Sequence, residues 1–190
     1  MRKLIVSEFI SLDGVMQAPG GADEDRDGGF AHGGWTLPYW HDDIGANFGK
    51  LFEDADAVLL GRRTYVTHAE AFEPAPEGDP FRHMKKYVVS KTLEKPLWRD
   101  TTIIRDDVVE AVRALKAGPG KKILTDGSSQ LVQALLANDL VDELHLLVYP
   151  ISLGGGKRVF PAGALTRFTL KEARPYPTGV VGLHYVLAST

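Results

Sequence analysis

The chain has 190 residues, of which 22 are basic and 25 acidic, and it contains no cysteine. This length suits one domain, residues 1–190, and the lack of cysteine excludes disulfides, thiolate zinc sites, iron–sulfur clusters and cysteine nucleophiles. The formal charge of −3 argues against nucleic acid as the main partner. No apolar stretch reaches the roughly 20 residues of a membrane helix, so we expect a cytoplasmic protein without a membrane partner.

The first quarter of the chain predicts a strand, a long loop and a helix. Residues 4–12 (LIVSEFISL) are β-branched and aromatic, which is typical of a strand, and the turn residues Asp13 and Gly14 follow. Residues 18–34 are rich in glycine and acidic residues and predict a surface loop, which at this length is usually functional or mobile. From Asp42 the apolar positions recur at the spacing of one helix face: Ile44, Phe48, Leu51 and Phe52.

Strands and helices alternate over the rest of the chain. Strands are expected at residues 56–60, 86–90, 101–105, 121–125 and 143–149, and helices after residue 61, over 108–115 and over 131–136. Two final segments, 167–173 and 180–188, alternate apolar and polar residues around a turn and predict an antiparallel pair. The expected fold class is therefore α/β with a mixed, mainly parallel sheet.

Three of the strand ends carry glycine, hydroxyl or cationic residues. They are Gly61, Arg62, Arg63 and Thr64 after the strand at 56–60, Ser90 and Lys91 at the end of the strand at 86–90, and Gly127, Ser128 and Ser129 after the strand at 121–125. At the first end the glycine permits close backbone approach, the arginines match phosphate geometry, and Thr64 is expected to cap the helix. Ligands of α/β sheets bind at the carboxyl ends of strands. The three ends together suggest a ligand with two separated phosphates, such as a dinucleotide, although the G-x-G-x-x-G fingerprint is absent.

Six short motifs follow one another along the chain: residues 11–14 (SLDG), 59–65 (LLGRRTY), 89–93 (VSKTL), 126–131 (DGSSQL), 140–144 (LVDEL) and 150–160 (PISLGGGKRVF). This ordered set resembles the dihydrofolate reductase-like superfamily. Within it, the chain is most similar to the reductase domain of bifunctional riboflavin-biosynthesis proteins and its standalone relatives. The resemblance implies a three-layer fold with flanking helices and a C-terminal antiparallel hairpin.

The resemblance also implies NADPH as the cofactor. In this superfamily the arginine–threonine turn meets the 2′-phosphate and pyrophosphate, the strand-end serine flanks the adenine, and the glycine turn covers the pyrophosphate. The implied cofactor-binding residues are Gly61, Arg62, Arg63, Thr64, Ser90, Lys91, Asp126, Gly127, Ser128, Ser129 and Leu131. Relatives often have Gly–Gly with a cis peptide where this chain has Asp126 and Gly127, and a non-proline cis bond costs about 3 kcal/mol.

The substrate side departs from folate reductases. The implied substrate residues are Asp13, Met16, Trp35 and Trp40. Folate reductases place an acidic side chain two residues after the proline of a Trp-x-Leu-Pro motif; here residues 35–38 (WTLP) are followed by Trp40 at that position. Asp43, expected on the same helix face one turn along, is the candidate proton donor, with a simple helix-start charge as the alternative. We therefore expect little dihydrofolate turnover.

Three further features have ordinary structural explanations. Asp23, Asp25 and Asp27 mimic the start of a calcium loop, but the twelfth position would be Gly34, so a solvated acidic loop is expected. The six histidines show no metal-ligand spacing, and we predict no metal site. Residues 154–156, three glycines, are either a phosphate loop or a bulge before a basic surface strand, and we favour the bulge.

The expected function is a standalone NADPH-dependent reductase, since the zinc deaminase that often accompanies this domain requires cysteine ligands. It would transfer hydride to a C=N or C=O of a small polar or heterocyclic substrate, in the manner of 5-amino-6-(5-phosphoribosylamino)uracil reductase. The alternative is a catalytically silent nucleotide-binding or sensor protein. A homodimer is expected, because standalone relatives commonly pair and the last strand carries an apolar face: Val181, Leu183, Tyr185 and Leu187.

Overall fold

One eight-stranded sheet, with strand order β4-β3-β2-β5-β1-β6-β8-β7, forms the centre of the computed structural model, which describes residues 1–163 and 165–188. The strands are β1 (Leu4–Ser11), β2 (Ala55–Gly61), β3 (Lys85–Val89), β4 (Thr101–Ile104), β5 (Lys122–Asp126), β6 (Glu143–Tyr149), β7 (Phe168–Pro175) and β8 (Val181–Leu187). The strands from β4 to β6 pair in parallel, and β8 and β7 continue the sheet antiparallel. The predicted mixed α/β class with a C-terminal antiparallel hairpin is confirmed.

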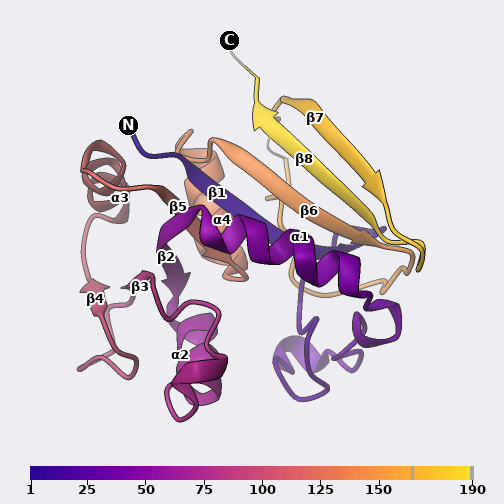
Figure 1. Cartoon of the computed structure of the whole chain (residues 1–190), viewed down its shortest axis with the longest axis horizontal. Coiled ribbons are helices and arrows are strands. Elements are labelled where there is room, and N and C mark those ends of the chain that lie inside the picture. Colours follow the sequence, from indigo (N-terminus) through magenta and orange to yellow (C-terminus); the bar gives the residue numbers. More distant parts are fainter. Residues whose placement is uncertain (164, 189–190) are drawn as a thin grey trace.

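The helices cover the sheet on both faces, which makes three layers (Figure 1). They are α1 (Asp42–Glu53), α2 (Arg62–Phe72), α3 (Val108–Ala117) and α4 (Ser129–Ala137). On one face, α1 and α2 pack through Phe52, Tyr65 and Ala69 against β2 and β3. On the other, α3 and α4 bury Val112 and Leu135 against β1 and β5. The central strands are apolar on both faces because both faces are covered.

A third core lies under the amino-terminal half of α1, where Ile44 packs with Leu147 and Tyr149 of β6. The expected boundaries agree with the structure within one or two residues at most elements. None of the helices in the described part of the chain is long and apolar enough to cross a membrane.

Candidate active site

The turns after β2 and β5 lie side by side at the carboxyl edge of the sheet and are hydrogen-bonded to each other. The backbone N–H of Gly61 donates to Ser128 Oγ at 2.9 Å, and the backbone N–H of Ser128 donates to Thr64 Oγ1 at 3.1 Å. A Cβ on Gly127 would lie 3.0 Å from the Thr64 side chain, and its φ of +63° also favours glycine. Two of the predicted phosphate-binding turns therefore form one unit.

Thr64 does not cap its own helix, so that expectation is wrong. The residue before α2 is Gly61, and neither this position nor Ser128 before α4 provides a side-chain cap. Thr64 instead accepts the hydrogen bond of the neighbouring turn. The first-turn N–H groups of both helices thus lack side-chain acceptors, which suits an anionic ligand. Ser129 begins α4 half-buried, whereas Leu131 is buried in the core.

The predicted cations at this edge differ in what they contact. Arg62 and Lys91 are exposed and form no ion pair with any described residue, whereas Arg63 pairs with Asp27 of the 18–34 loop. Ser90 is buried, and its Oγ accepts backbone N–H groups of the turn that follows β3. Its hydroxyl hydrogen therefore remains available to donate.

A buried carboxyl group lies next to the turn after β5. Oε2 of Glu8 accepts the Gly127 N–H at 3.1 Å, while Oε1 is buried and finds no partner in the described residues. Burial, and secondarily the charge of Asp126, raises the pKa of Glu8 well above its ordinary value of 4.5. Asp126 faces α2, with Oδ2 3.1 Å from Nε2 of His68. No peptide bond in the described residues is cis, including the one between Asp126 and Gly127.

Asp13 and Met16 hold the end of β1 against the glycine segment at 154–156. Oδ1 of Asp13 accepts from the Ser11 hydroxyl at 2.7 Å and from the Leu153 N–H at 3.0 Å, and Oδ2 accepts from the Gly154 N–H at 2.8 Å. These bonds lower the pKa of Asp13 below its ordinary value of 3.8. Met16 is buried in the core. The basic stretch after the glycines forms only an isolated bridge, between Val15 and Arg158, so the expected basic strand is absent from the described structure.

The two tryptophans of the predicted substrate side lie in different surroundings. Trp35 is buried, donates its Nε1–H to the carbonyl of Gln17 at 2.8 Å and packs edge-on against Tyr149. Trp40 is 48% exposed and precedes α1, in extended conformation. The expected shared helix face of Trp40 and Asp43 is therefore wrong, since α1 begins only at Asp42.

Asp43 is an exposed residue of the first turn of α1. Its backbone N–H donates to His41 Nδ1 at 3.2 Å, and its carboxylate lies 3.6 Å from the same nitrogen. This environment is that of a helix-start charge, and a catalytic role for Asp43 stays a prediction.

The acidic loop at 18–34 is tied to the rest of the molecule by cations. Asp25 and Asp27 both pair with Lys157, Asp27 with Nζ at 2.9 Å, and Asp27 also reaches Arg63. The Gln17 amide supports this arrangement by donating to the carbonyls of Asp25 and Asp27. The loop thus bridges the glycine segment and the start of α2.

Two histidines that are far apart in the sequence are brought together by the antiparallel pairing of β6 and β8. His145 and His184 are directly opposite each other, and their rings stack with centroids 4.1 Å apart. Oε2 of Glu143 lies 3.4 Å from Nε2 of each. This group could not be found by spacing along the chain, because its members meet only in the register of the strands; the available signal was that Glu143 and His145 alternate onto one face of the same strand.

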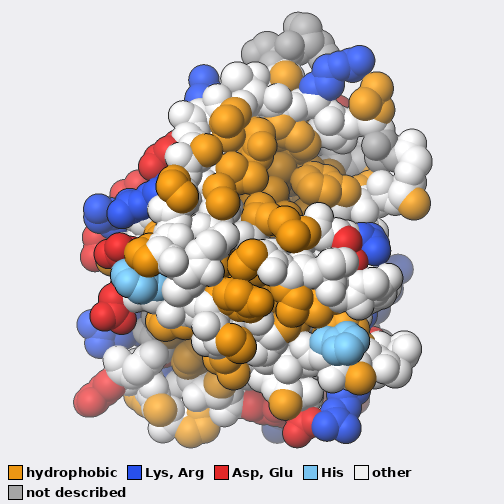
Figure 2. Space-filling view, turned by 90° about the vertical axis from the view of Figure 1, so that its right-hand side faces the viewer, with side chains coloured by type: hydrophobic (Ala, Val, Ile, Leu, Met, Phe, Trp, Pro, Cys, Tyr) orange, Lys and Arg blue, Asp and Glu red, His pale blue; other side chains and the backbone are white. Residues whose placement is uncertain are grey.

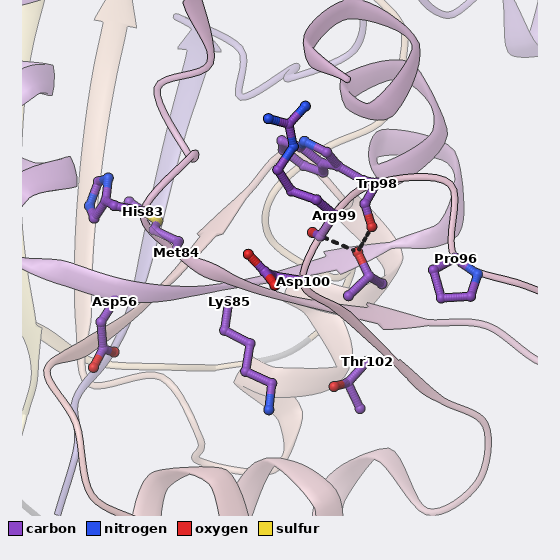
Figure 3. A pocket seen from close by; sticks show the side chains of 10 residues that line it. Asp56, His83, Met84, Lys85, Pro96, Trp98, Arg99, Asp100 and Thr102 are labelled. Carbon is purple, nitrogen blue, oxygen red and sulfur yellow. Dashed lines mark hydrogen bonds between the residues drawn. The ribbon is translucent and has the colours of Figure 1, made fainter. Parts of the chain in front are cut away.

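A cavity of about 740 Å³ is lined by other residues than those described above (Figure 3). It opens at the amino ends of β3 and β4, beside Lys85, Asp100 and Thr102. Because ligands of such sheets bind at the carboxyl ends of strands, we do not assign the active site to it.

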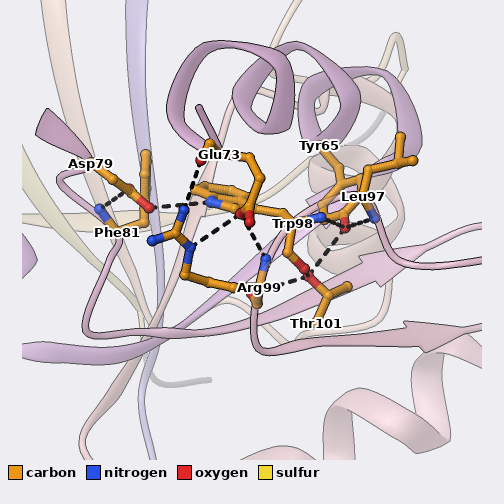
Figure 4. Close-up of polar contacts among 8 residues, drawn as sticks. All are labelled: Tyr65, Glu73, Asp79, Phe81, Leu97, Trp98, Arg99 and Thr101. Carbon is orange, nitrogen blue, oxygen red and sulfur yellow. Dashed lines mark hydrogen bonds and ion pairs between the residues drawn. The ribbon is translucent and has the colours of Figure 1, made fainter. Parts of the chain in front are cut away.

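The neighbouring segment at 97–101 is held by a structural polar network (Figure 4). The Tyr65 hydroxyl accepts the N–H groups of Leu97 and Trp98, and Glu73 Oε2 accepts two N–H groups of Arg99. The Trp98 indole N–H donates to Asp79 at 3.1 Å. This network fixes the segment that leads into β4.

Comparison with known proteins gives consistent matches. The model of the RibD C-terminal domain family matches residues 2–182. Two uncharacterized proteins of Bacillus subtilis (strain 168) are each 27% identical to this chain. The match with YyaP covers 97% of this chain and 94% of YyaP, and the match with YwjB covers 98% of this chain and 99% of YwjB.

Solved structures share the fold. A protein of Shewanella sp. PV-4 named for riboflavin biosynthesis has a TM-score of 0.69 at 20% identity, covering 98% of this chain and 99% of its own. A pyrimidine reductase-like protein of Corynebacterium diphtheriae has a TM-score of 0.68 at 15% identity, and the match covers 100% of this chain and 93% of that one. For RibD of Acinetobacter baumannii the TM-score is 0.67 at 14% identity, and the match covers all of this chain but 59% of that one.

Proposed function

Because its family model matches residues 2–182, the chain belongs to the RibD C-terminal domain family, and we propose that it is an NADPH-dependent reductase. Its reaction would be hydride transfer to a C=N or C=O of a small polar or heterocyclic molecule. The observation that carries this proposal is the paired turn at the carboxyl edge, where Gly61, Thr64 and Ser128 join two helix starts that lack side-chain caps.

The residues present fit a dinucleotide phosphate. The first turns of α2 and α4 offer N–H groups to phosphate oxygens, and Gly127 has no side chain that would cover its turn. Arg62 and Lys91 are exposed cations without an anion in the described structure, so they are available for the 2′-phosphate. Ser90 can donate its hydroxyl toward the adenine side. The bound cofactor would supply the hydride, and the protein would orient it and exclude water.

A reductase also needs a proton, and the chain offers two carboxyl groups for that role. Asp43, paired with His41, is the proposed donor, and Asp43→Asn should lower kcat while leaving NADPH affinity unchanged. Burial raises the pKa of Glu8, but this side chain accepts the Gly127 N–H and supports that turn. The substrate is proposed to differ from dihydrofolate, because Trp40 has no carboxylate to bond a pterin edge.

The decisive experiment titrates NADPH and NADH by fluorescence and then measures NADPH oxidation with pterin, pyrimidine and carbonyl substrates. We expect NADPH to bind more tightly than NADH, and Arg62→Ala to remove most of that preference, because a charge-assisted contact contributes about 1.5–3 kcal/mol. Equal affinities for the two cofactors would refute the proposal. Tight NADPH binding without turnover of any substrate would favour a nucleotide sensor instead.

The proposal includes a homodimer formed through the C-terminal hairpin. The hairpin of β7 and β8 forms one edge of the sheet (Figure 1). Three of its apolar side chains are only partly buried against the core, Phe168, Leu183 and Tyr185, and Leu170 is exposed beside them. Figure 2 shows apolar side chains gathered on the side of the molecule that carries these strands. Leu170 is 49% exposed, an exposure that a second copy would relieve.

Light scattering tests the dimer. Leu170→Asp should produce monomers, whereas Thr169→Asp, on the opposite face of the same strand, should not. A mass near 20.8 kDa for the unmodified protein at micromolar concentration would refute this arrangement.

A further inference from the structure

A cluster of two imidazoles and one carboxylate lies on the α1-facing side of the sheet. Glu143 and His145 share one face of β6, and His184 meets them from β8. Their ligand atoms all lie within 4.8 Å of one another, and within the described residues this is the one group of histidine and acidic side chains that does so. Glu143 and His145 belong to the first half of β6 and His184 lies opposite on β8, so none of the three is among the candidate cofactor residues.

The two distances from the Glu143 carboxylate to the imidazoles match those between ligands of one metal ion. Glu143 Oε2 is 3.4 Å from His145 Nε2 and 3.4 Å from His184 Nε2. Zinc bonds nitrogen and oxygen at about 2.0–2.1 Å, so neighbouring ligands of a tetrahedral zinc site are about 3.3–3.4 Å apart. The same separation is long for a hydrogen bond, which is usually about 2.9–3.0 Å for N–H···O.

The surroundings leave the three ligand atoms without better partners. Glu143 is buried, and its other oxygen, Oε1, accepts from Lys3 Nζ at 2.6 Å, which fixes the carboxylate with Oε2 toward the imidazoles. His184 Nε2 is buried and has no hydrogen-bond partner in the described residues. Ser7 of β1 lies next to His145 of β6 in the strand register, and its hydroxyl is also buried without a hydrogen-bond partner in the described residues. Such groups cost stability unless a ligand satisfies them.

A cavity of about 250 Å³ between α1 and the sheet gives access to the cluster. His145, His184 and Ser7 line it, so a metal ion would have room for a water molecule at one further position. The charged side chains around this cavity are of both signs: Lys50, Lys122, Arg174, Asp54 and Glu172. Lys122 pairs with Asp54 at 3.1 Å, which moderates its repulsion of a cation.

We infer that the protein binds one divalent transition-metal ion, of the Zn²⁺ class, through Glu143 Oε2, His145 Nε2 and His184 Nε2, with a fourth position open to the cavity. Two imidazoles, a carboxylate and an open position are a donor set that zinc and its neighbours accept. Because the ligands come from β6 and β8, the ion would cross-link the C-terminal hairpin to the parallel part of the sheet.

The test is calorimetric titration of the chelator-treated protein with Zn²⁺, and with Co²⁺ followed by visible absorption. We expect one site per chain, a rise of Tm on binding, and affinity at least about 10-fold weaker in His184→Gln and Glu143→Gln. His32→Gln, which changes an exposed histidine elsewhere, is the matched control and should bind as the unmodified protein does. Circular dichroism establishes that each variant is folded.

A readout on the unmodified protein keeps the test decisive if a variant fails to fold. Imidazole ¹⁵N NMR should show that Zn²⁺ shifts the signals of two histidines, His145 and His184, out of six. Absence of one-site binding, binding that survives in a folded His184→Gln variant, or shifts at other histidines would overturn the inference.

Discussion

The ion pair between Arg63 and Asp27 occupies a guanidinium that the family resemblance implies for a cofactor phosphate. Oδ2 of Asp27 also lies 2.9 Å from Nζ of Lys157, so the same carboxylate oxygen contacts both cations. If phosphate binds Arg63, Asp27 has to leave it. We predict that Asp27→Asn, which keeps the side-chain size and removes the charge, tightens NADPH binding.

The exposure of the pair sets the size of the effect. The side chains of Arg63 and Asp27 are 62% and 43% exposed, so water screens their attraction. Exposed ion pairs contribute about 0.2–1 kcal/mol, which corresponds to about 1.5- to 5-fold tighter binding of NADPH at room temperature. The gain should shrink as ionic strength rises, because the Debye length falls to about 8 Å at physiological salt.

Fluorescence titration of NADPH at low and high salt measures this effect. Asp23→Asn is the matched control, since Asp23 lies on the same loop but pairs with Arg26, three residues away. A double variant with Arg63→Ala should lose the gain. Equal affinity of Asp27→Asn and the unmodified protein at low salt, or an equal gain in the control, would show that Arg63 is not used by the phosphate.

Three predictions concern stability. Because the pKa of Glu8 is raised, the folded protein retains a proton that the unfolded chain loses above the ordinary value of 4.5, so the free energy of unfolding falls as pH rises above that value. The stability gain of Glu8→Gln over the unmodified protein in denaturant unfolding should therefore grow with pH. Parallel curves of stability against pH for the two proteins would contradict this. The lowered pKa of Asp13 has the opposite effect: Asp13 stabilises the folded protein above its ordinary pKa of 3.8, and this stabilisation is lost on acidification. The Asp13→Asn variant should therefore lose less stability in acid than the unmodified protein does. Gly127→Ala should cost about 1–3 kcal/mol of unfolding free energy, because it combines a positive φ with contact to Thr64. Gly154→Ala, with positive φ and open space around its Cβ, should cost less.

The layered fold could be predicted because its signals are local. The apolar run of β2 ends at Gly61, and the helix face of α1 repeats at the expected spacing, so each element is visible in a short window of sequence. The paired C-terminal strands were visible for the same reason, through alternation around a turn.

The parts that were missed depend on contacts between distant segments. Thr64 has the chemistry of a cap, but the Ser128 N–H of another turn takes its oxygen. The helix was expected from Asp42 and begins there, but Trp40 was wrongly placed on its face, because His41 accepts the Asp43 N–H and fixes where the helix begins. The cluster at Glu143 requires the register of β6 against β8, which no local pattern specifies.

The bonds between the turns after β2 and β5 have an evolutionary consequence. Ser128 uses its hydroxyl for the backbone N–H of Gly61, and Thr64 uses its oxygen for the backbone N–H of Ser128, so each side chain is selected for a backbone contact as well as for a ligand. Replacing either side chain by an apolar one leaves a backbone N–H without its partner. Homologous sequences should therefore keep a hydrogen-bond acceptor at each of these two positions, and adaptation to another cofactor has to proceed through other residues of this edge.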